Sequence, residues 1–535
     1  MNLLICSRTL FGSTLLLAFC CTAFAQQAPA PSLATPPEEN SKDTLRVSTQ
    51  RVLLDVVVTD SKGNPVRNLT EDDFQVYEDH VPQVIKSFEE TQSRALSAKL
   101  PINSTAELDK KEPNAPVSIL VLDELATKFE DQAFTRYSLK KYLKSQGNTL
   151  AQPTMLVVVN FKHFMVLRDY TTSKQEILNA LDQHMSTMAW NVGSGYEQTS
   201  QFKATFASLM EVAEATAGHP GHKNMIWVGR GFPSMDLTMM DPVAIDAIQQ
   251  TIQICTNTLL DARITLYAID PAGLTGRTED VDHNQFSDAD PFGKDADPFG
   301  DGVSFKALAK ATGGRSFYNR NDVDNMIGKS FDSGTNFYTL SYRPTSGGTE
   351  DKAFRNIHIV MKDKALHAAT RKGYYNQQPA VAPVKPADSK MTSRVAFDLT
   401  LALQSMMVYD EIPLTVTRSK TDSDNFLLRL DSSLIPENGT GPADFMVFVE
   451  SFDQKGKMLD RTAYTATESV ASNGAAPTKY LSISTHIETA PPAARLRFVL
   501  RLNNTGKLGA ANYYLVDPST ITDPRGGRTL HRNKN

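Results

Sequence analysis

A carboxylate and a hydroxyl group stand where an apolar strand ends, at Asp123 and Thr127. The run Val117-Ser-Ile-Leu-Val-Leu-Asp123 is typical of a parallel strand buried on both faces, because such strands are apolar throughout instead of alternating. Open α/β sheets bind their ligands at the carboxyl ends of the strands. Asp123 and Thr127 are therefore the first candidates for a binding site.

A second candidate is a tandem of acidic residues, in which Asp288-Ala-Asp-Pro-Phe-Gly293 is repeated as Asp295-Ala-Asp-Pro-Phe-Gly300. Paired acids offer oxygens to Ca²⁺, but an EF-hand loop needs a longer ligand series that ends in Glu, and that series is absent. The composition favours an acidic insertion over a calcium site. Because the insertion follows the carboxyl end of a strand, we also predict that it exposes Phe292 and Phe299 as a recognition loop.

Other sequence patterns with metal-binding or catalytic potential are weak. His219-Pro-Gly-His222 has no cysteine or nearby acid to complete a metal site, and we predict a solvated turn there. The chain contains no Gly-x-Ser-x-Gly elbow, zinc-protease His-Glu pair or phosphate loop. These absences favour binding over catalysis.

Apolar strands alternate with helical stretches from Val117 to about Pro344. The strands include residues 155–161, 224–228 and 264–269, and the helical stretches are 174–188, 201–217 and 242–261. Asp241 is placed as the N-cap of the last helix, with Pro242 at its first position. This alternation predicts a parallel, doubly wound α/β sheet.

Shorter strands with turn signals between them flank that segment. They predict an N-terminal β module and, from residue 393 onward, a C-terminal β-sandwich whose first strand spans 395–403. The predicted division is a signal peptide (1–25), a disordered linker (26–43), the N-terminal β module (44–100), the α/β domain (113–345), closing β strands (346–376), a linker (377–392) and the β-sandwich (393–520).

Four segments resemble the VWFA-related domain proteins of the Acidobacterial type, which contain a von Willebrand factor A-like domain. The segments are Val52-Leu-Leu-Asp-Val-Val-Val-Thr-Asp60, Lys62-Gly-Asn-Pro-Val66 with Leu69-Thr-Glu-Asp-Asp-Phe74, Val76-Tyr-Glu-Asp79 with Pro82-Gln83, and Arg371-Lys-Gly-Tyr-Tyr375. The resemblance covers about residues 45–375. It implies a Rossmann-like von Willebrand A domain in an exported protein that binds other proteins and has no established enzymatic activity.

In that family an Asp-x-Ser-x-Ser turn helps to hold a divalent cation, and the resemblance implies Mg²⁺ or Ca²⁺ wherever the site is intact. Here Asp123 and Thr127 match the first and last positions, whereas Leu125 stands at the middle position and cannot ligate. Arg230, in Gly229-Arg230-Gly231, stands about where the family has a second acid. We therefore expect a degenerate, metal-free site. Either the Arg230 guanidinium pairs with Asp123 and replaces the cation, or it points to solvent.

The N-terminus has the pattern of an export signal. An apolar run from Leu10 to Phe24 follows Arg8, and Ala23-Phe24-Ala25 precedes Gln26, where cleavage is expected. Lipid anchoring at Cys20 or Cys21 remains the alternative. The formal net charge of −5, from 55 basic and 60 acidic residues, argues against nucleic acid as a partner, and no later segment is long and apolar enough to span a bilayer.

The sequence thus predicts an exported, non-enzymatic protein that is periplasmic, secreted or on the cell surface and binds a protein partner. The predicted binding face comprises Asp123, Thr127, Arg230, Phe292 and Phe299. Two alternatives from other classes are a hydrolase associated with the cell envelope and a structural component of the envelope.

Overall fold

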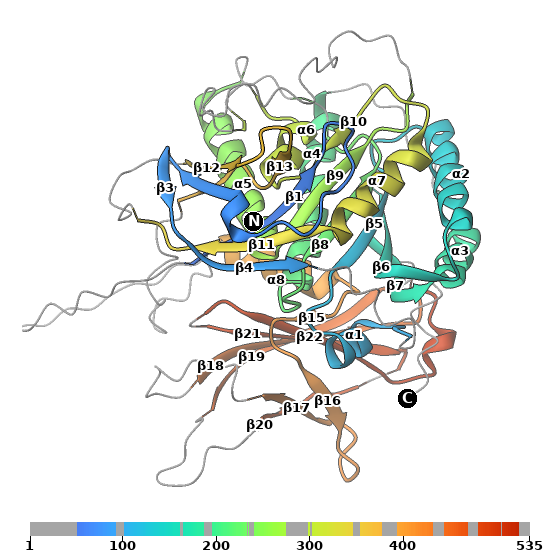
Figure 1. Cartoon of the computed structure of the whole chain (residues 1–535). Coiled ribbons are helices and arrows are strands. Elements are labelled where there is room, and N and C mark those ends of the chain that lie inside the picture. The colour runs from blue at the N-terminus through green and yellow to red at the C-terminus, as the bar shows by residue number, and fades with distance from the viewer. Residues whose placement is uncertain are drawn as a thin grey trace, which may run out of the picture. The chain divides into compact units, whose positions relative to one another are not determined.

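The computed structural model describes most of the chain from Arg51 onward (Figure 1). The described residues are 51–91, 101–160, 164–186, 195–232, 234, 240–273, 298–299, 302–345, 354–376, 393–431, 443–468, 480–489, 491–503 and 505–523. The predicted signal peptide with Cys20 and Cys21, both predicted linkers and Phe292 lie outside these residues. The chain has a central, mostly parallel sheet in a mixed α/β region, with antiparallel sheets on its N-terminal and C-terminal sides.

The central sheet has six strands in the order β10-β9-β8-β5-β6-β7. All neighbouring pairs are parallel except β6 and β7, which are antiparallel at the edge. The strands are β5 (Val117–Asp123), β6 (Thr149–Val159), β7 (Phe164–Ser173), β8 (Lys223–Val228), β9 (Ile264–Ile269) and β10 (Ser316–Phe317). Every residue of β5 is buried, as the apolar run predicts.

Helices cover both faces of this sheet, because successive side chains of a strand point to opposite sides. Ile119 and Val121 join one core with α4 (Gly195–Ala215), α5 (Pro242–Asp261) and α6 (Phe305–Ala311). Leu120 and Leu122 join the other with α2 (Phe129–Ser145), α3 (Lys174–Gln183) and α7 (Val323–Thr335). A short helix, α1 (Thr105–Lys111), precedes β5.

The start of α5 confirms a prediction made from local sequence. Its bounds agree with the predicted helix 242–261, and the Asp241 side chain accepts a hydrogen bond from Ala244 N while Pro242 occupies the first turn. Proline fits that position because the first amides of a helix have no partner within the helix.

The N-terminal strands and the predicted closing strands interleave in two four-stranded sheets, β13-β1-β11-β4 and β14-β12-β2-β3. Both sheets contribute side chains to one hydrophobic core. β11, which the sequence placed inside the α/β segment, pairs with β1 and β4 instead. The strands are β1 (Val52–Thr59), β2 (Phe74–Glu78), β3 (Val81–Gln83), β4 (Ile85–Thr91), β11 (Phe337–Tyr342), β12 (Phe354–Met361), β13 (His367–Ala369) and β14 (Gly373–Tyr375).

The C-terminal part has a five-stranded sheet, β15-β22-β21-β18-β19, and a three-stranded sheet, β16-β17-β20, which share one core. The strands are β15 (Tyr409–Asp410), β16 (Thr415–Arg418), β17 (Asn425–Asp431), β18 (Ala443–Phe452), β19 (Met458–Glu468), β20 (Tyr480–His486), β21 (Arg495–Leu502) and β22 (Leu508–Tyr514). Within the described residues, no helix combines the length and apolarity that crossing a bilayer requires.

The predicted strand at 395–403 is wrong, because these residues lie in helix α8 (Ser393–Gln404). Leu399, Ala402 and Leu403 are buried and are spaced three and four residues apart, which places them on one helical face. That face packs in the same core as α4. An apolar segment of this length fits either periodicity, and the tertiary contact selects the helix.

Candidate functional site

The candidate site lies at the carboxyl ends of β5 and β8, which are neighbours in the sheet. After β5 the chain continues to α2 on one face, whereas after β8 it continues to α5 on the other. Such a switch point opens a crevice at the edge of an α/β sheet. Asp123 ends β5, and Gly229-Arg230-Gly231 follows β8, so the fold brings these two predicted segments together.

Asp123 is buried, and donors surround its carboxylate. Oδ1 accepts hydrogen bonds from the backbone amides of Leu125 and Ala126, at 2.8 and 3.0 Å. Oδ2 accepts from Trp227 Nε1 at 3.2 Å and from the Gly231 amide at 2.8 Å. Burial raises the pKa of Asp123, while these hydrogen bonds oppose the rise. A carboxylate has about four lone-pair positions, so these four donors leave it with no free acceptor.

Thr127 is also buried and engaged. Its hydroxyl oxygen accepts a hydrogen bond from the Arg230 amide at 3.3 Å, and its carbonyl accepts one from the Gln132 side chain at 2.8 Å. The loop after β8 lies directly on this turn, since a Cβ on Gly229 would fall 2.2 Å from the Cβ of Asp123. Gly229 also has a φ of +152°, which L side chains rarely adopt.

The donor set does not fit a divalent cation. Mg²⁺ and Ca²⁺ need several free oxygens in a near-regular arrangement, whereas the oxygens of Asp123 and Thr127 already accept hydrogen bonds. Leu125 is fully buried in the core beside α4, so it contributes nothing polar to the edge. Among the described residues, no three His, Cys, Asp or Glu side chains converge as a metal-binding group.

Of the two alternatives for Arg230, pairing with Asp123 does not occur in the structure. The guanidinium instead lies 3.9 Å from Asp131, in the first turn of α2, and 3.9 Å from Asp270, which follows β9. Both separations exceed a hydrogen bond, and the buried Nε of Arg230 has no hydrogen-bond partner. The Asp123 carboxylate is already saturated by backbone and indole donors, so nothing draws the guanidinium inward. The Arg230 side chain keeps 33% of its surface exposed.

Asp131 and Asp270 are site residues that the sequence analysis missed. Burial raises the pKa of Asp131, with the Arg230 charge opposing the rise and the Asp270 charge adding to it. Asp270 directly follows a strand that was correctly predicted, so the rule that singled out Asp123 would also have found it. For Asp131 the signal was weaker, because no helix had been predicted at α2.

Two further predictions about exposure are wrong. Phe299 is only 8% exposed and belongs to the core with Val303 and Phe305, so it is not a recognition residue on the surface. His219 and His222 are buried as well, and neither lies in a solvated turn. His222 Nδ1 lies 3.0 Å from Asp55 Oδ2, which ties the turn to β1.

Comparisons with known proteins add little. No family model matches the chain, and no curated protein matches it. Among solved structures, a β-glucuronidase from Bacteroides uniformis is similar at 11% identity and a TM-score of 0.13. That match covers 33% of this chain and 18% of the glucuronidase, and it is too weak to support a statement about fold or activity.

Proposed function

We propose that this chain is an exported, non-enzymatic protein that binds a protein partner through a degenerate von Willebrand A-like domain without a cation. In this proposal the two C-terminal sheets form a β-sandwich, and residues 1–25 direct export. The strand order supports the fold assignment. Numbered along the α/β region, the sheet β7-β6-β5-β8-β9-β10 reads 3-2-1-4-5-6, the order of doubly wound sheets that bind ligands at their switch point.

The observation that carries the proposal is the separation of buried and exposed charge at this switch point. Asp123 lies beneath the surface with every acceptor position used. Above it, Arg230 is held loosely between Asp131 and Asp270 at 3.9 Å from each. The guanidinium, which stays charged at any physiological pH, places at this edge the positive charge that a cation would otherwise bring.

This arrangement suits recognition better than catalysis. A general base must accept a proton, and the Asp123 carboxylate has no acceptor position left for one. By contrast, Arg230, Asp131 and Asp270 keep part of their surface exposed, and Phe129, in the same first turn of α2 as Asp131, is 53% exposed. Arginine and aromatic side chains are enriched among the residues that dominate binding energy, and the charges set the orientation of a partner.

The test is capture of partners from an envelope extract by the full-length protein, with Mg²⁺ or with a chelator. Wild type is compared with Arg230→Ala and with Arg429→Ala, which removes an exposed arginine from β17 in the C-terminal part. We expect a defined set of proteins to be captured equally with and without chelator. Arg230→Ala should lose that set, and Arg429→Ala should retain it.

Two results would refute the proposal. Capture that disappears with chelator and with Asp123→Asn would show that a cation mediates binding. A set of captured proteins that is unchanged in Arg230→Ala would show that partners bind elsewhere on the molecule.

A further inference from the structure

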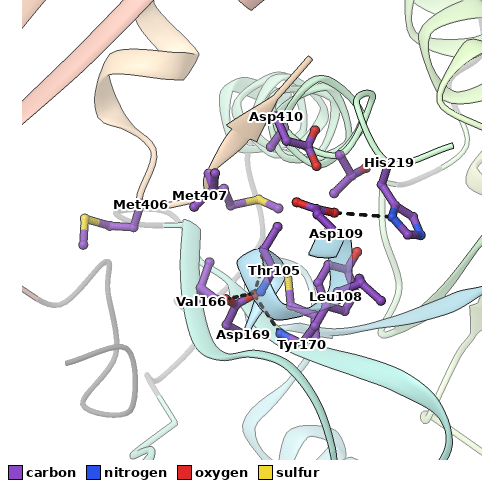
Figure 2. Close-up of a pocket in the computed structure, with 14 residues that line it drawn as sticks. Thr105, Leu108, Asp109, Val166, Asp169, Tyr170, His219, Met406, Met407 and Asp410 are labelled. Carbon is purple, nitrogen blue, oxygen red and sulfur yellow. Dashed lines mark hydrogen bonds and ion pairs between the residues drawn. The ribbon is translucent and has the colours of Figure 1, made fainter. Parts of the chain in front are cut away.

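A small pocket lies between the α/β region and the first residues of the C-terminal part (Figure 2). Its lining comes from α1, β6, β7, the end of α4 with the turn after it, and the segment 406–410. The cavity volume is about 30 Å³, which admits water molecules but no organic ligand. The pocket is therefore best understood through the groups that line it.

Asp410, on β15, carries the contact across this boundary. Its Oδ1 accepts a hydrogen bond of 2.9 Å from the amide of Gly218, in the turn after α4. A Cβ on Gly218 would lie 2.3 Å from the Asp410 backbone, so the two chain segments are in direct contact. The Asp410 carboxyl is thus inserted into the α/β region when the two parts are docked.

Charged and polar groups from several elements line the pocket that this carboxyl enters. Asp109 comes from α1, and Figure 2 shows its carboxyl pointing toward that of Asp410. His219 Nδ1 lies 3.6 Å from Asp109 Oδ1. From β7 come Asp169, which accepts two hydrogen bonds from Thr105, and Tyr170, whose buried hydroxyl has no hydrogen-bond partner.

The remaining neighbours do not neutralise Asp410 by direct contact. Lys223, on β8, donates its hydrogen bonds to the carbonyls of His219, Gly221 and Ala262, so the α/β region holds this ammonium by itself. On the C-terminal side, Asp410 pairs with Gly509 of β22, which has no side chain. The charges of Glu211 and Glu214, on α4, act on the neighbouring Tyr409. Burial raises the pKa of Tyr409, and these two charges add to the rise.

We propose that Asp410 is a proton-controlled latch, which holds the C-terminal part against the α/β region more tightly when its carboxyl group is protonated than when it is ionised. A neutral carboxyl can take this buried position beside Asp109 at low cost, whereas an ionised one loses most of its water and meets a like charge. Gly218 supplies one donor to the carboxyl in the docked arrangement.

The direction of the pH dependence follows from linkage. Burial raises the pKa of Asp410 from 3.8 to about 7 in the docked protein. The charge of Asp109 adds to this rise, and the charge of Lys223 opposes it. The stabilisation is complete below pH 4 and is lost as the pH rises toward 7, because the undocked carboxyl releases its proton in that interval. Docking should weaken by at most about tenfold per pH unit there. Burial also lowers the pKa of Lys223 to about 7, and the Asp410 charge opposes that shift, so the ionised Asp410 and Lys223 are coupled in the docked protein.

The test is amide hydrogen exchange of the full-length protein between pH 5 and pH 8, corrected for intrinsic exchange rates. The informative segments are 215–220 and 405–412, which face each other at the pocket. We expect protection of both segments in wild type to fall several-fold between pH 5 and pH 7. Asp410→Asn keeps an acceptor for Gly218 but carries no charge, so its protection should stay level. Asp460→Asn, at an exposed acid of β19, should behave as wild type.

A second variant keeps the test decisive if Asp410→Asn fails to fold. Asp109→Asn removes the like charge, so the loss of protection should move to lower pH. Protection that is level in wild type, or a slope that survives in Asp410→Asn, would overturn the proposal and assign any pH dependence to another group.

Discussion

Trp227 Nε1 donates a hydrogen bond of 3.2 Å to Asp123 Oδ2, linking two adjacent parallel strands at their carboxyl ends. The same oxygen accepts a hydrogen bond from the amide of Gly231, so one carboxylate holds both the indole and the loop after β8. The buried Asp123 therefore has a structural role, because it holds the loop after β8 against the end of β5. In the proposed function, the partly exposed charges of Arg230, Asp131 and Asp270 serve recognition.

Asp123→Ala should destabilise the protein strongly. It leaves the amides of Leu125, Ala126 and Gly231 and the indole of Trp227 without their acceptor in a buried place. Each unsatisfied group costs about 1 to 3 kcal/mol, so we expect a loss of more than about 3 kcal/mol in the free energy of unfolding. Urea titration followed by circular dichroism measures it. Asp460→Ala, at the exposed acid of β19, should cost clearly less, and equal losses would contradict this account.

Gly229→Ala tests the close approach of the β8 loop to Asp123. The new Cβ would lie 2.2 Å from the Asp123 Cβ at a φ of +152°. We expect a cost of about 3 kcal/mol from strain and displacement. Gly63→Ala is the matched control, because Gly63 also has a positive φ, of +82°, but has nothing within 4 Å of its Cβ position. If the two variants lose equal stability in urea, the loop does not pack as described.

Arg230→Ala should leave stability almost unchanged while it removes partner capture. Its ion pairs are 3.9 Å long, and a third of the side chain is exposed. Such pairs contribute less than about 1 kcal/mol. Thermal unfolding of the variant and of wild type provides the measurement. A loss of more than about 2 kcal/mol would make Arg230 a structural residue and weaken the proposed recognition role.

Asp55 should make stability sensitive to acid. Burial alone would raise its pKa, but His222 and Arg263 lower the pKa of this carboxyl well below its usual range. The stabilisation is present above about pH 4 and is lost as the pH falls through the lowered pKa. Asp55→Asn should cost about 3 kcal/mol at pH 7 and should flatten the acid limb of the stability profile. An acid limb in Asp55→Asn that matches wild type would exclude Asp55 as its origin.

Sequence patterns predicted the elements whose signals are local. The buried strand that ends at Asp123 and the helix from Pro242 to Asp261, with its Asp241 cap, have the predicted bounds. Periodicity and capping act within a few residues, so they are legible in the chain. Helix α8 was wrongly predicted as a strand. Its apolar spacing fits either structure, and packing against α4 decides in favour of the helix.

Long-range relationships were not predictable in this way. Strand β11 pairs with β1, although nearly the whole α/β region lies between them in the sequence. No local pattern identifies that partner. Likewise, the sequence located Arg230 at the correct edge but not its ion partners. The Arg230 side chain lies near Asp131 and not near Asp123, because backbone donors such as the Gly231 amide already occupy the acceptor positions of Asp123.

Titration calorimetry of the full-length protein with Mg²⁺, Mn²⁺ and Ca²⁺ tests the central claim most directly, namely that the edge at Asp123 holds no cation. Asp123 and Thr127 already accept hydrogen bonds from the protein, so we predict no binding heat at micromolar affinity for any of the three ions. Micromolar binding that disappears in Asp123→Asn, a variant of nearly the same shape, would contradict the account.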